Sequence, residues 1–413
     1  MKRLLSYILL LVMVNLACAR SNSGASGSPT SASAPAVPAT PPSVPAEYQS
    51  LADELNSEMG AFENTLSQQS DQSPSNVIIA TDLAYANGNI GEALLQSQTM
   101  QLNQTLLDRL QTIGVKGVVI QISFPLLDPS FPRNSEYLQF FQNVVAEAHK
   151  RGIKVLVESG TIFSGTAYSS VKVDYSKYTT QTFLHGRENQ VLLIASQVRP
   201  DYLMIGNEPT TEEMLTHLTI TPPNWGNFLN DTMSRIDHSN ILIGTGTGTW
   251  EDPSYFNQAM QVKGIDFIDL HIYPMGKNAS LLDRAFTYAQ KARDAGKRVT
   301  ISEAWLYKAS PELNGGYGNF SEIYDRDVYS FWEPLDARFI TDILKLADTT
   351  HMDFVSFFWT RYFFSYLDYN ATDHNQSTES FNRQINQAGL AAVQNGSISS
   401  LGQWFQQELS SRH

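Results

Sequence analysis

The sequence predicts an α/β fold, a (β/α)8 TIM barrel, as a single domain after an export signal and a disordered linker. Two observations carry this prediction. From about residue 48 to the end of the 413-residue chain, short apolar runs alternate with amphipathic stretches, as in repeated βα units around a parallel sheet. Gly152, Gly264 and Gly296 each follow a helical stretch and precede an apolar run, which indicates short turns from helix to strand.

The first 19 residues have the composition of a signal peptide. Lys2 and Arg3 precede an apolar run from Leu4 to Val14, and small residues follow at Ala17 to Ala19. The apolar run is shorter than the ~18 residues that a membrane-spanning helix needs. We therefore expect an exported protein without a transmembrane helix.

Cys18 is the single cysteine, so the chain cannot form an intramolecular disulfide. The segment from Asn15 to Cys18 resembles the processing site of bacterial lipoproteins, in which the cysteine is lipidated and becomes the first mature residue. Ordinary cleavage after Ala19 also satisfies the A-x-A rule and would release a secreted protein. We expect a lipoprotein of the bacterial cell envelope that contacts the membrane only through a lipid at Cys18.

Residues 20–47 consist almost entirely of Ser, Ala, Pro, Gly, Thr and Val. Such a segment cannot bury enough apolar surface to offset the entropy of the chain. We expect a semi-extended tether, followed by the barrel domain over residues 48–413. A short helix within residues 49–66 is expected to close the bottom of the barrel.

The eight expected strands are short apolar segments, mostly buried on both faces. They cover residues 77–82, 117–123, 154–158, 202–208, 241–245, 267–273, 299–303 and 354–359. Between them, residues 137–148 and 281–289 carry apolar side chains at helical spacing. The longest loops follow strands seven and eight, over residues 305–335 and 360–395. Active sites of such barrels lie on this side, at the carboxyl ends of the strands.

The net charge of −13 argues against nucleic acid or an anionic membrane surface as a partner. Neutral partners such as carbohydrates fit this charge better. The barrel itself does not specify a reaction, because it carries many unrelated activities.

Two strand ends each carry a glutamate. Strand four ends in Gly206-Asn207-Glu208-Pro209, and strand seven ends in Ser302-Glu303-Ala304-Trp305. Hydrolysis of a glycosidic bond needs one carboxyl group to protonate the leaving oxygen and a second to attack the anomeric carbon or activate water. The positions of Glu208 and Glu303 at the ends of strands four and seven therefore favour them as a catalytic pair at the mouth of the barrel.

These residues resemble the large clan of retaining glycosidases known as GH-A, which includes cellulases and galactanases. The resemblance implies that Glu208 is the acid/base, that Glu303 is the nucleophile and that Asn207 binds a sugar 2-hydroxyl. It further implies that His271 and Tyr273 lie in the site, with the tyrosine hydrogen-bonded to the nucleophile. The mechanism implied needs neither a metal nor a cofactor.

The resemblance also implies that Trp359 is a sugar platform followed by a non-proline cis peptide to Thr360. Two features of the clan are missing, an arginine near strand one or two and a histidine after strand three. Strand two offers Gln121 and Ser123 instead, and strand three ends in Glu158.

Other candidates for substrate binding each have a structural alternative. Asp82 and Glu158 could bind sugar hydroxyls or accept hydrogen bonds from loop backbone. Trp250 and Trp305 could stack on a sugar ring or belong to the core. The aromatic-rich loop from Tyr307 to Trp332 could be a substrate lid or a packed excursion.

We expect a glycoside hydrolase that cleaves a β-linked polysaccharide or oligosaccharide by double displacement. Two alternatives remain open. A metal-dependent barrel enzyme could use Asp82, Glu158, Glu208 and Glu303 as ligands. A non-catalytic sugar-binding lipoprotein could keep the barrel and its cleft.

Overall fold

A computed structural model describes residues 42–69, 75–166, 168–238, 240–274, 279–309, 326–370 and 376–412. The signal sequence, Cys18 and the linker up to residue 41 lie outside these residues. Within the described ranges, no helix combines the length and the hydropathy required to cross a membrane.

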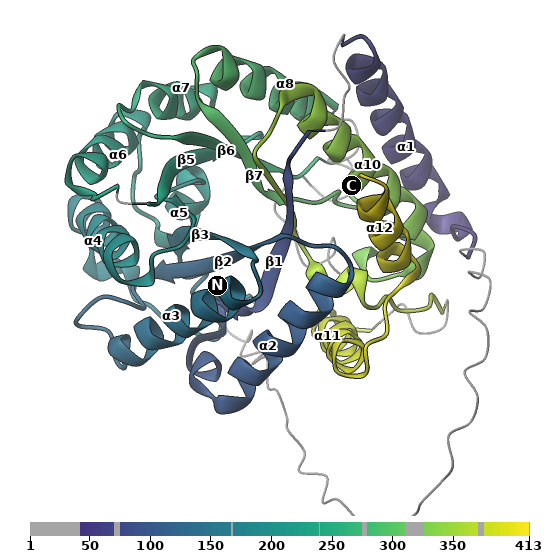
Figure 1. The fold of residues 1–413 in the computed structure, drawn as a ribbon, viewed down its shortest axis with the longest axis horizontal. Helices are drawn as coiled ribbons and strands as arrows, with labels where there is room; N and C mark the ends of the chain where they lie inside the picture. Colours follow the sequence, from purple (N-terminus) through teal and green to yellow (C-terminus); the bar gives the residue numbers. More distant parts are fainter. Residues whose placement is uncertain are drawn as a thin grey trace, which may run out of the picture.

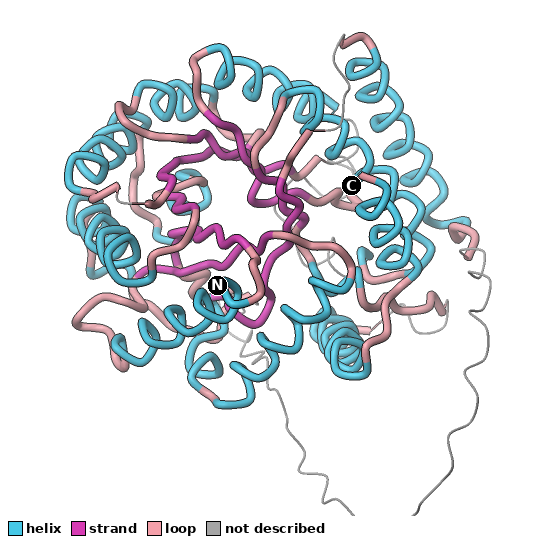
Figure 2. Tube along the Cα trace, viewed as in Figure 1, coloured by secondary structure: helices cyan, strands magenta, loops and turns pink. Residues whose placement is uncertain are grey.

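Eight parallel strands close into a barrel in chain order, and β8 pairs back onto β1 (Figures 1 and 2). The predicted (β/α)8 barrel is confirmed. The strands are β1 (Ile78–Asn87), β2 (Gly117–Phe124), β3 (Lys154–Thr161), β4 (Tyr202–Met204), β5 (Leu242–Gly248), β6 (Phe267–Ile272), β7 (Arg298–Ala304) and β8 (Phe354–Phe357).

All eight predicted strands occur, but some ends differ. β4 stops at Met204 and the next helix begins at Pro209, so Glu208 lies in the short turn between them. Proline suits the first turn of a helix, where its missing N–H costs nothing. β1 runs past Asp82 to Asn87, with a shift of register between these two residues.

Helices surround the barrel as an outer ring (Figure 1). The two predicted helices correspond to α3 and α8, and Gly152 and Gly296 adopt the expected positive φ of 69° and 73°. The helices are α1 (Ala46–Ser67), α2 (Ser97–Thr112), α3 (Asn134–Lys150), α4 (Thr180–Leu193), α5 (Pro209–Thr216), α6 (Pro222–Arg235), α7 (Pro253–Gln261), α8 (Ala279–Asp294), α10 (Glu333–Thr350), α11 (Thr378–Asn395) and α12 (Ser400–Ser411), with shorter helical turns η1 (Gly88–Leu95), η2 (Tyr175–Lys177), η3 (Ile194–Val198), η4 (Ser330–Trp332) and η5 (Thr360–Phe363).

The expectation that the first helix closes the bottom of the barrel is wrong. α1 lies along the outside of the ring, beside α10 and α8 (Figure 1). Its apolar residues recur on one face and are buried, for example Leu55 and Phe62. Arg338 of α10 forms two hydrogen bonds, of 2.9 and 2.8 Å, with the carboxylate of Glu63. The apolar face of α1 is therefore buried against α10 and α8 rather than against the bottom of the barrel.

The barrel interior has an apolar floor made by side chains from opposite strands. Tyr202 of β4 packs against Phe354 of β8, with ring centroids 5.4 Å apart. Val119 and Leu156 belong to the same cluster. Because side chains alternate along a strand, the residues two positions further on face the same interior, toward the carboxyl ends. Most of the residues at these next interior positions are polar, so a polar layer lies above the apolar floor.

Candidate active site

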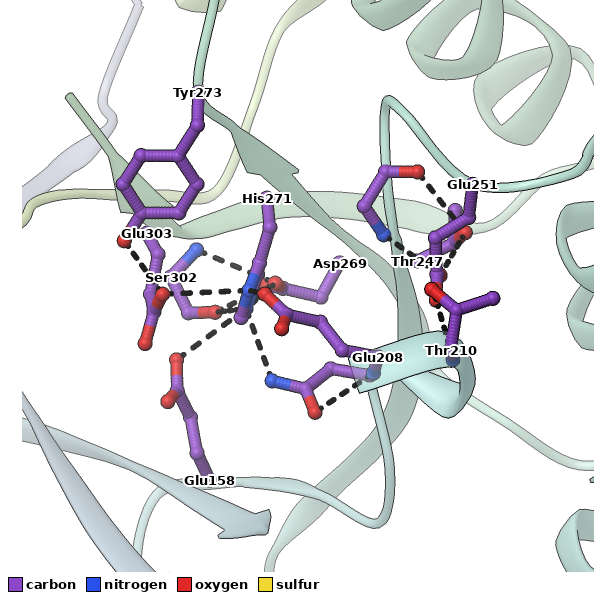
Figure 3. A network of polar contacts seen from close by, with 12 residues as sticks. Glu158, Glu208, Thr210, Thr247, Glu251, Asp269, His271, Tyr273, Ser302 and Glu303 are labelled. Carbon is purple, nitrogen blue, oxygen red and sulfur yellow. Dashed lines mark hydrogen bonds and ion pairs between the residues drawn. The ribbon is translucent and has the colours of Figure 1, made fainter. Parts of the chain in front are cut away.

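The polar side chains above this floor come from several strands and meet at the carboxyl end of the barrel (Figure 3). Gln121 stands two residues after Val119, and Glu158 two residues after Leu156. On β6 and β7 the register pairs His271 with Glu303. Residues far apart in the chain thus become neighbours because the barrel closes.

Glu208 is held at the start of a helix. It is the residue immediately before α5, and its backbone N–H donates to Asn207 Oδ1 at 2.9 Å. Its side chain is 15% exposed, the highest value among the carboxylates around His271. Glu208 is therefore the carboxylate most open to a ligand from the mouth.

Glu303 is buried and receives two hydrogen bonds. The Tyr273 hydroxyl donates to Oε2 at 2.6 Å, and the Gln121 amide donates to Oε1. Burial raises the pKa of Glu303 well above its usual value, and the charge of Glu158 raises it further, whereas His271 opposes this shift. The phenol of Tyr273 keeps its proton, because burial and the charge of Glu303 raise its pKa.

His271 lies between the two glutamates. Its Nδ1 is 2.6 Å from Glu208 Oε1 and 3.5 Å from Glu303 Oε2. Burial by itself would lower the pKa of His271, but the charges of Glu303, Glu158 and Glu208 raise it well above the usual value. The imidazole is thus the cationic partner of a carboxylate cluster.

The other ring nitrogen of His271 is fixed by a relay of hydrogen bonds. Nε2 is 2.9 Å from Ser302 Oγ, and that hydroxyl donates to Asp269 Oδ1 at 2.6 Å. Because the hydroxyl proton points to Asp269, Ser302 Oγ is available to accept from a protonated Nε2 of His271. Asn207 Nδ2 lies 3.2 Å from the same nitrogen. Burial raises the pKa of Asp269 to about 6.

For two residues near this cluster, no role was predicted from the sequence. Gln121 links Glu158 and Glu303, and Glu251 follows β5 with its carboxylate buried. Glu251 accepts from the backbone N–H of Thr210 at 2.9 Å, which ties the segment after Glu208 to β5. Burial raises the pKa of Glu251 to about 7. The sequence signal for Gln121 was its place near the end of the expected strand 117–123, two residues before Ser123.

Asp82 does not join the cluster. Its Oδ1 accepts from the backbone N–H and the hydroxyl of Thr360, both at 2.7 Å. Of the two roles expected for Asp82, the structure therefore favours acceptance of hydrogen bonds from a loop over binding of sugar hydroxyls. The carboxylate fastens the loop after β8 to β1.

The cis peptide expected between Trp359 and Thr360 is wrong. In the described part of the chain, the cis bond is Phe124–Pro125. Trp359 instead adopts a left-handed φ of 69° at the start of η5, where Thr360 bonds to Asp82. The Trp359 ring is partly buried, and the Arg361 guanidinium lies 4.4 Å from its centroid.

The two remaining tryptophans differ in exposure. Trp250 is partly buried, and its ring centroid is 5.8 Å from that of Tyr273, so it lies next to the cluster. Trp305 is fully buried, stacked on Tyr362 at 5.4 Å with the Lys308 ammonium 5.1 Å from its ring. The expectation that Trp305 stacks on a sugar is therefore wrong, because both of its faces are covered by protein.

The aromatic loop after β7 is described only in part. Residues 310–325, with Tyr317, Phe320 and Tyr324, lie outside the described residues. In the described part, Tyr329 and Phe331 are buried and stacked 5.5 Å apart, and Trp332 is buried beside them. This part is packed as core.

Glu158, His271 and Glu303 bring potential metal-ligand atoms within 4.8 Å of one another. The two carboxylates, however, lie against different ring nitrogens. Glu158 Oε1 is 3.5 Å from Nε2, and Glu303 Oε2 is 3.5 Å from Nδ1. A metal ion needs ligand atoms that converge on one point about 2 Å away. The arrangement fits a protonated imidazole between carboxylates better than a metal centre.

No protein-family model and no curated protein matches the chain. Among solved structures, a GH5_18 enzyme variant from Bifidobacterium longum subsp. longum, in complex with Manb1-4GlcNAc, is similar with a TM-score of 0.51 and 13% identity, over 81% of this chain and 78% of that one. The exo-beta-1,4-mannosidase Op5Man5 from Opitutaceae bacterium strain TAV5 is similar with a TM-score of 0.50 and 12% identity, over 82% of this chain and 60% of that one. At these identities, the likeness shows a shared barrel fold.

Proposed function

We propose that this chain is a retaining glycoside hydrolase in which Glu303 is the nucleophile and Glu208 is the general acid/base. One observation carries the proposal, namely that the two carboxylates meet at the same nitrogen, His271 Nδ1, at the carboxyl end of the barrel. Two carboxyl groups on either side of the scissile bond are the requirement for this chemistry.

The separation of the two groups supports retention of configuration. Oxygens that lie 2.6 and 3.5 Å from one nitrogen are at most about 6 Å apart. Inverting enzymes hold their carboxyl groups at roughly 6.5–9.5 Å to admit a water molecule, and retaining enzymes at about 5–5.5 Å. The Tyr273 hydroxyl fixes Glu303 Oε2, so that Glu303 is oriented for attack.

The hydrogen bonds also suggest where the catalytic proton resides. With Nε2 of His271 protonated, the short contact between Nδ1 and Glu208 Oε1 holds a second proton. In the first step, Glu303 attacks the anomeric carbon while this proton passes through Glu208 to the leaving oxygen. In the second step, water displaces Glu303, and its proton returns to the Glu208–His271 pair.

The substrate class is a β-linked oligosaccharide or polysaccharide. Trp250 and Trp359 are partly buried and follow strand ends, where an aromatic face can stack on a pyranose. Two of the solved structures that share the barrel are a mannosidase and an enzyme holding Manb1-4GlcNAc. β-mannosides therefore belong in the substrate panel, beside β-glucans and β-galactans.

The test uses the chain without its signal peptide, with Glu303→Gln and Glu208→Gln as variants. We expect the wild type to release reducing ends from at least one β-linked substrate, with the retained anomer seen first by NMR. Both variants should lose turnover. An inverted first product, or a Glu303→Gln variant with normal rates, would contradict the assignment of roles.

We further propose that the protein is exported and anchored in the cell envelope through a lipid on Cys18. The lipoprotein-like segment Asn15 to Cys18 supports this. A clickable palmitate analogue should label the expressed protein, and Cys18→Ser should abolish the label. Equal labelling of the variant would refute the anchor.

A further inference from the structure

We propose that Glu158 is a positioning residue that sets the pH at which Glu303 and His271 ionise. This inference rests on the proposed function and concerns its regulation by pH. Glu158 extends from β3 and is 2% exposed, so it is not placed to contact a substrate directly. Its influence must pass through its neighbours.

The first of these neighbours is Gln121. Its Nε2 donates to Glu158 Oε2 at 3.0 Å and also to Glu303 Oε1. The opposite end of the amide, Oε1, accepts from Asn87 Nδ2. The amide orientation is thus fixed by Asn87, and one NH2 group holds both carboxylates. Glu158 and Glu303 are two negative groups tied to one neutral donor.

The second neighbour is His271. Glu158 Oε1 accepts no hydrogen bond from a described residue, although it is buried, and it lies 3.5 Å from His271 Nε2. A buried carboxylate oxygen without a donor is costly unless a cation is close. The imidazolium supplies that cation. Conversely, removal of the Glu158 charge should make the protonated imidazole less stable.

The groups that face Glu158 set the direction of its effect. The acidic ones are Glu303, Asp269 and Asp82, each of which interacts electrostatically with Glu158, and the cationic one is His271. A like charge within about 4–6 Å makes a carboxyl harder to ionise, and an opposite charge stabilises an imidazolium. Glu158 therefore raises the pKa of Glu303 and of His271 together. It shifts the window of activity to higher pH without taking part in a bond change.

The test is Glu158→Gln, which keeps the shape and removes the charge. Both limbs of the pH profile of kcat/KM should move to lower pH, by about one unit. A merely structural role would lower the rate without moving the limbs. The matched control is Glu188→Gln, a buried carboxylate on α4 whose ion-pair partners are His185 and Arg235, and it should leave the profile in place.

A second variant acts in the opposite direction. Gln121→Glu adds a carboxyl group at the same place and should move both limbs to higher pH. It keeps the proposal testable if Glu158→Gln does not fold. Unmoved limbs in a folded variant, or a shift of the wrong sign, would overturn the proposal.

A measurement that needs no activity separates this inference from the proposed function. In 15N-histidine-labelled protein, the His271 signal is the one missing from His271→Asn. Its pKa should fall in Glu158→Gln and rise in Gln121→Glu. If no substrate is cleaved but the His271 pKa moves in this way, the proposed function fails and the role of Glu158 stands. A constant His271 pKa would refute that role.

Discussion

The Tyr273 hydroxyl donates to Glu303 Oε2 at 2.6 Å and so joins the end of β6 to the end of β7. Tyr273→Phe removes this donor and leaves the ring. A hydrogen bond to a charged group contributes about 1.5–3 kcal/mol, so kcat should fall roughly 10- to 150-fold, and the acid limb should move to higher pH. Tyr288→Phe, at a buried tyrosine stacked on Phe256, is the control. Equal effects of the two variants would argue against the role of Tyr273.

Trp305 and Trp359 should respond in opposite ways to substitution by alanine. Trp305 is fully buried, so Trp305→Ala should lower the free energy of unfolding by about 3–5 kcal/mol. Trp359→Ala should chiefly raise KM, with a smaller loss of stability. Chemical denaturation and steady-state kinetics on both variants check this. A stable Trp305→Ala with a raised KM would restore Trp305 as a sugar platform.

Lys308 is buried with two aspartates in contact. Its ammonium donates to Asp336 and to the Leu306 carbonyl, and Asp327 Oδ1 is 3.6 Å away. Lys308→Met leaves these carboxylates without their cation and should cost about 3–5 kcal/mol of stability. Adding Asp336→Asn should recover part of that loss. Lys177→Met, at an exposed lysine beside the exposed Asp174, should change stability by no more than about 0.5 kcal/mol.

Glu251 makes stability depend on pH. Its pKa is about 7 in the folded chain and near the usual 4.5 when unfolded, so the folded state binds more protons between these values. The free energy of unfolding should therefore fall as pH rises from 4.5 to 7, by up to about 3 kcal/mol from this residue. Denaturation curves of wild type and Glu251→Gln measure the difference. An identical slope in both proteins would contradict the prediction.

Chelation should leave the activity unchanged, because the carboxylates of the cluster lie against different nitrogens of His271. The check is turnover after treatment with EDTA and dialysis into metal-free buffer, with and without added Zn²⁺ or Ca²⁺. Activity that disappears with EDTA and returns with one ion would favour the metal-dependent alternative.

The alternation of short apolar runs and amphipathic stretches was enough to predict the barrel and the order of its strands. Helices and strands each have their own spacing of apolar residues, so the local pattern is enough to recognise each element. Glu208 and Glu303 could be singled out in the same way, because strand ends of a parallel barrel share one mouth. The outer position of α1 could not be predicted, because an apolar helix face shows that the helix is covered but not which surface covers it.

The sequence by itself thus determined the (β/α)8 fold and the two strand-end glutamates, and the resemblance to a known clan pointed to His271 and Tyr273. Only the tertiary structure decided that Gln121 joins Glu158 to Glu303, that Asp82 fastens a loop and that Trp305 belongs to the core. The physical reason is that strand period fixes which way a side chain points, whereas its partners depend on closure and register of the whole barrel.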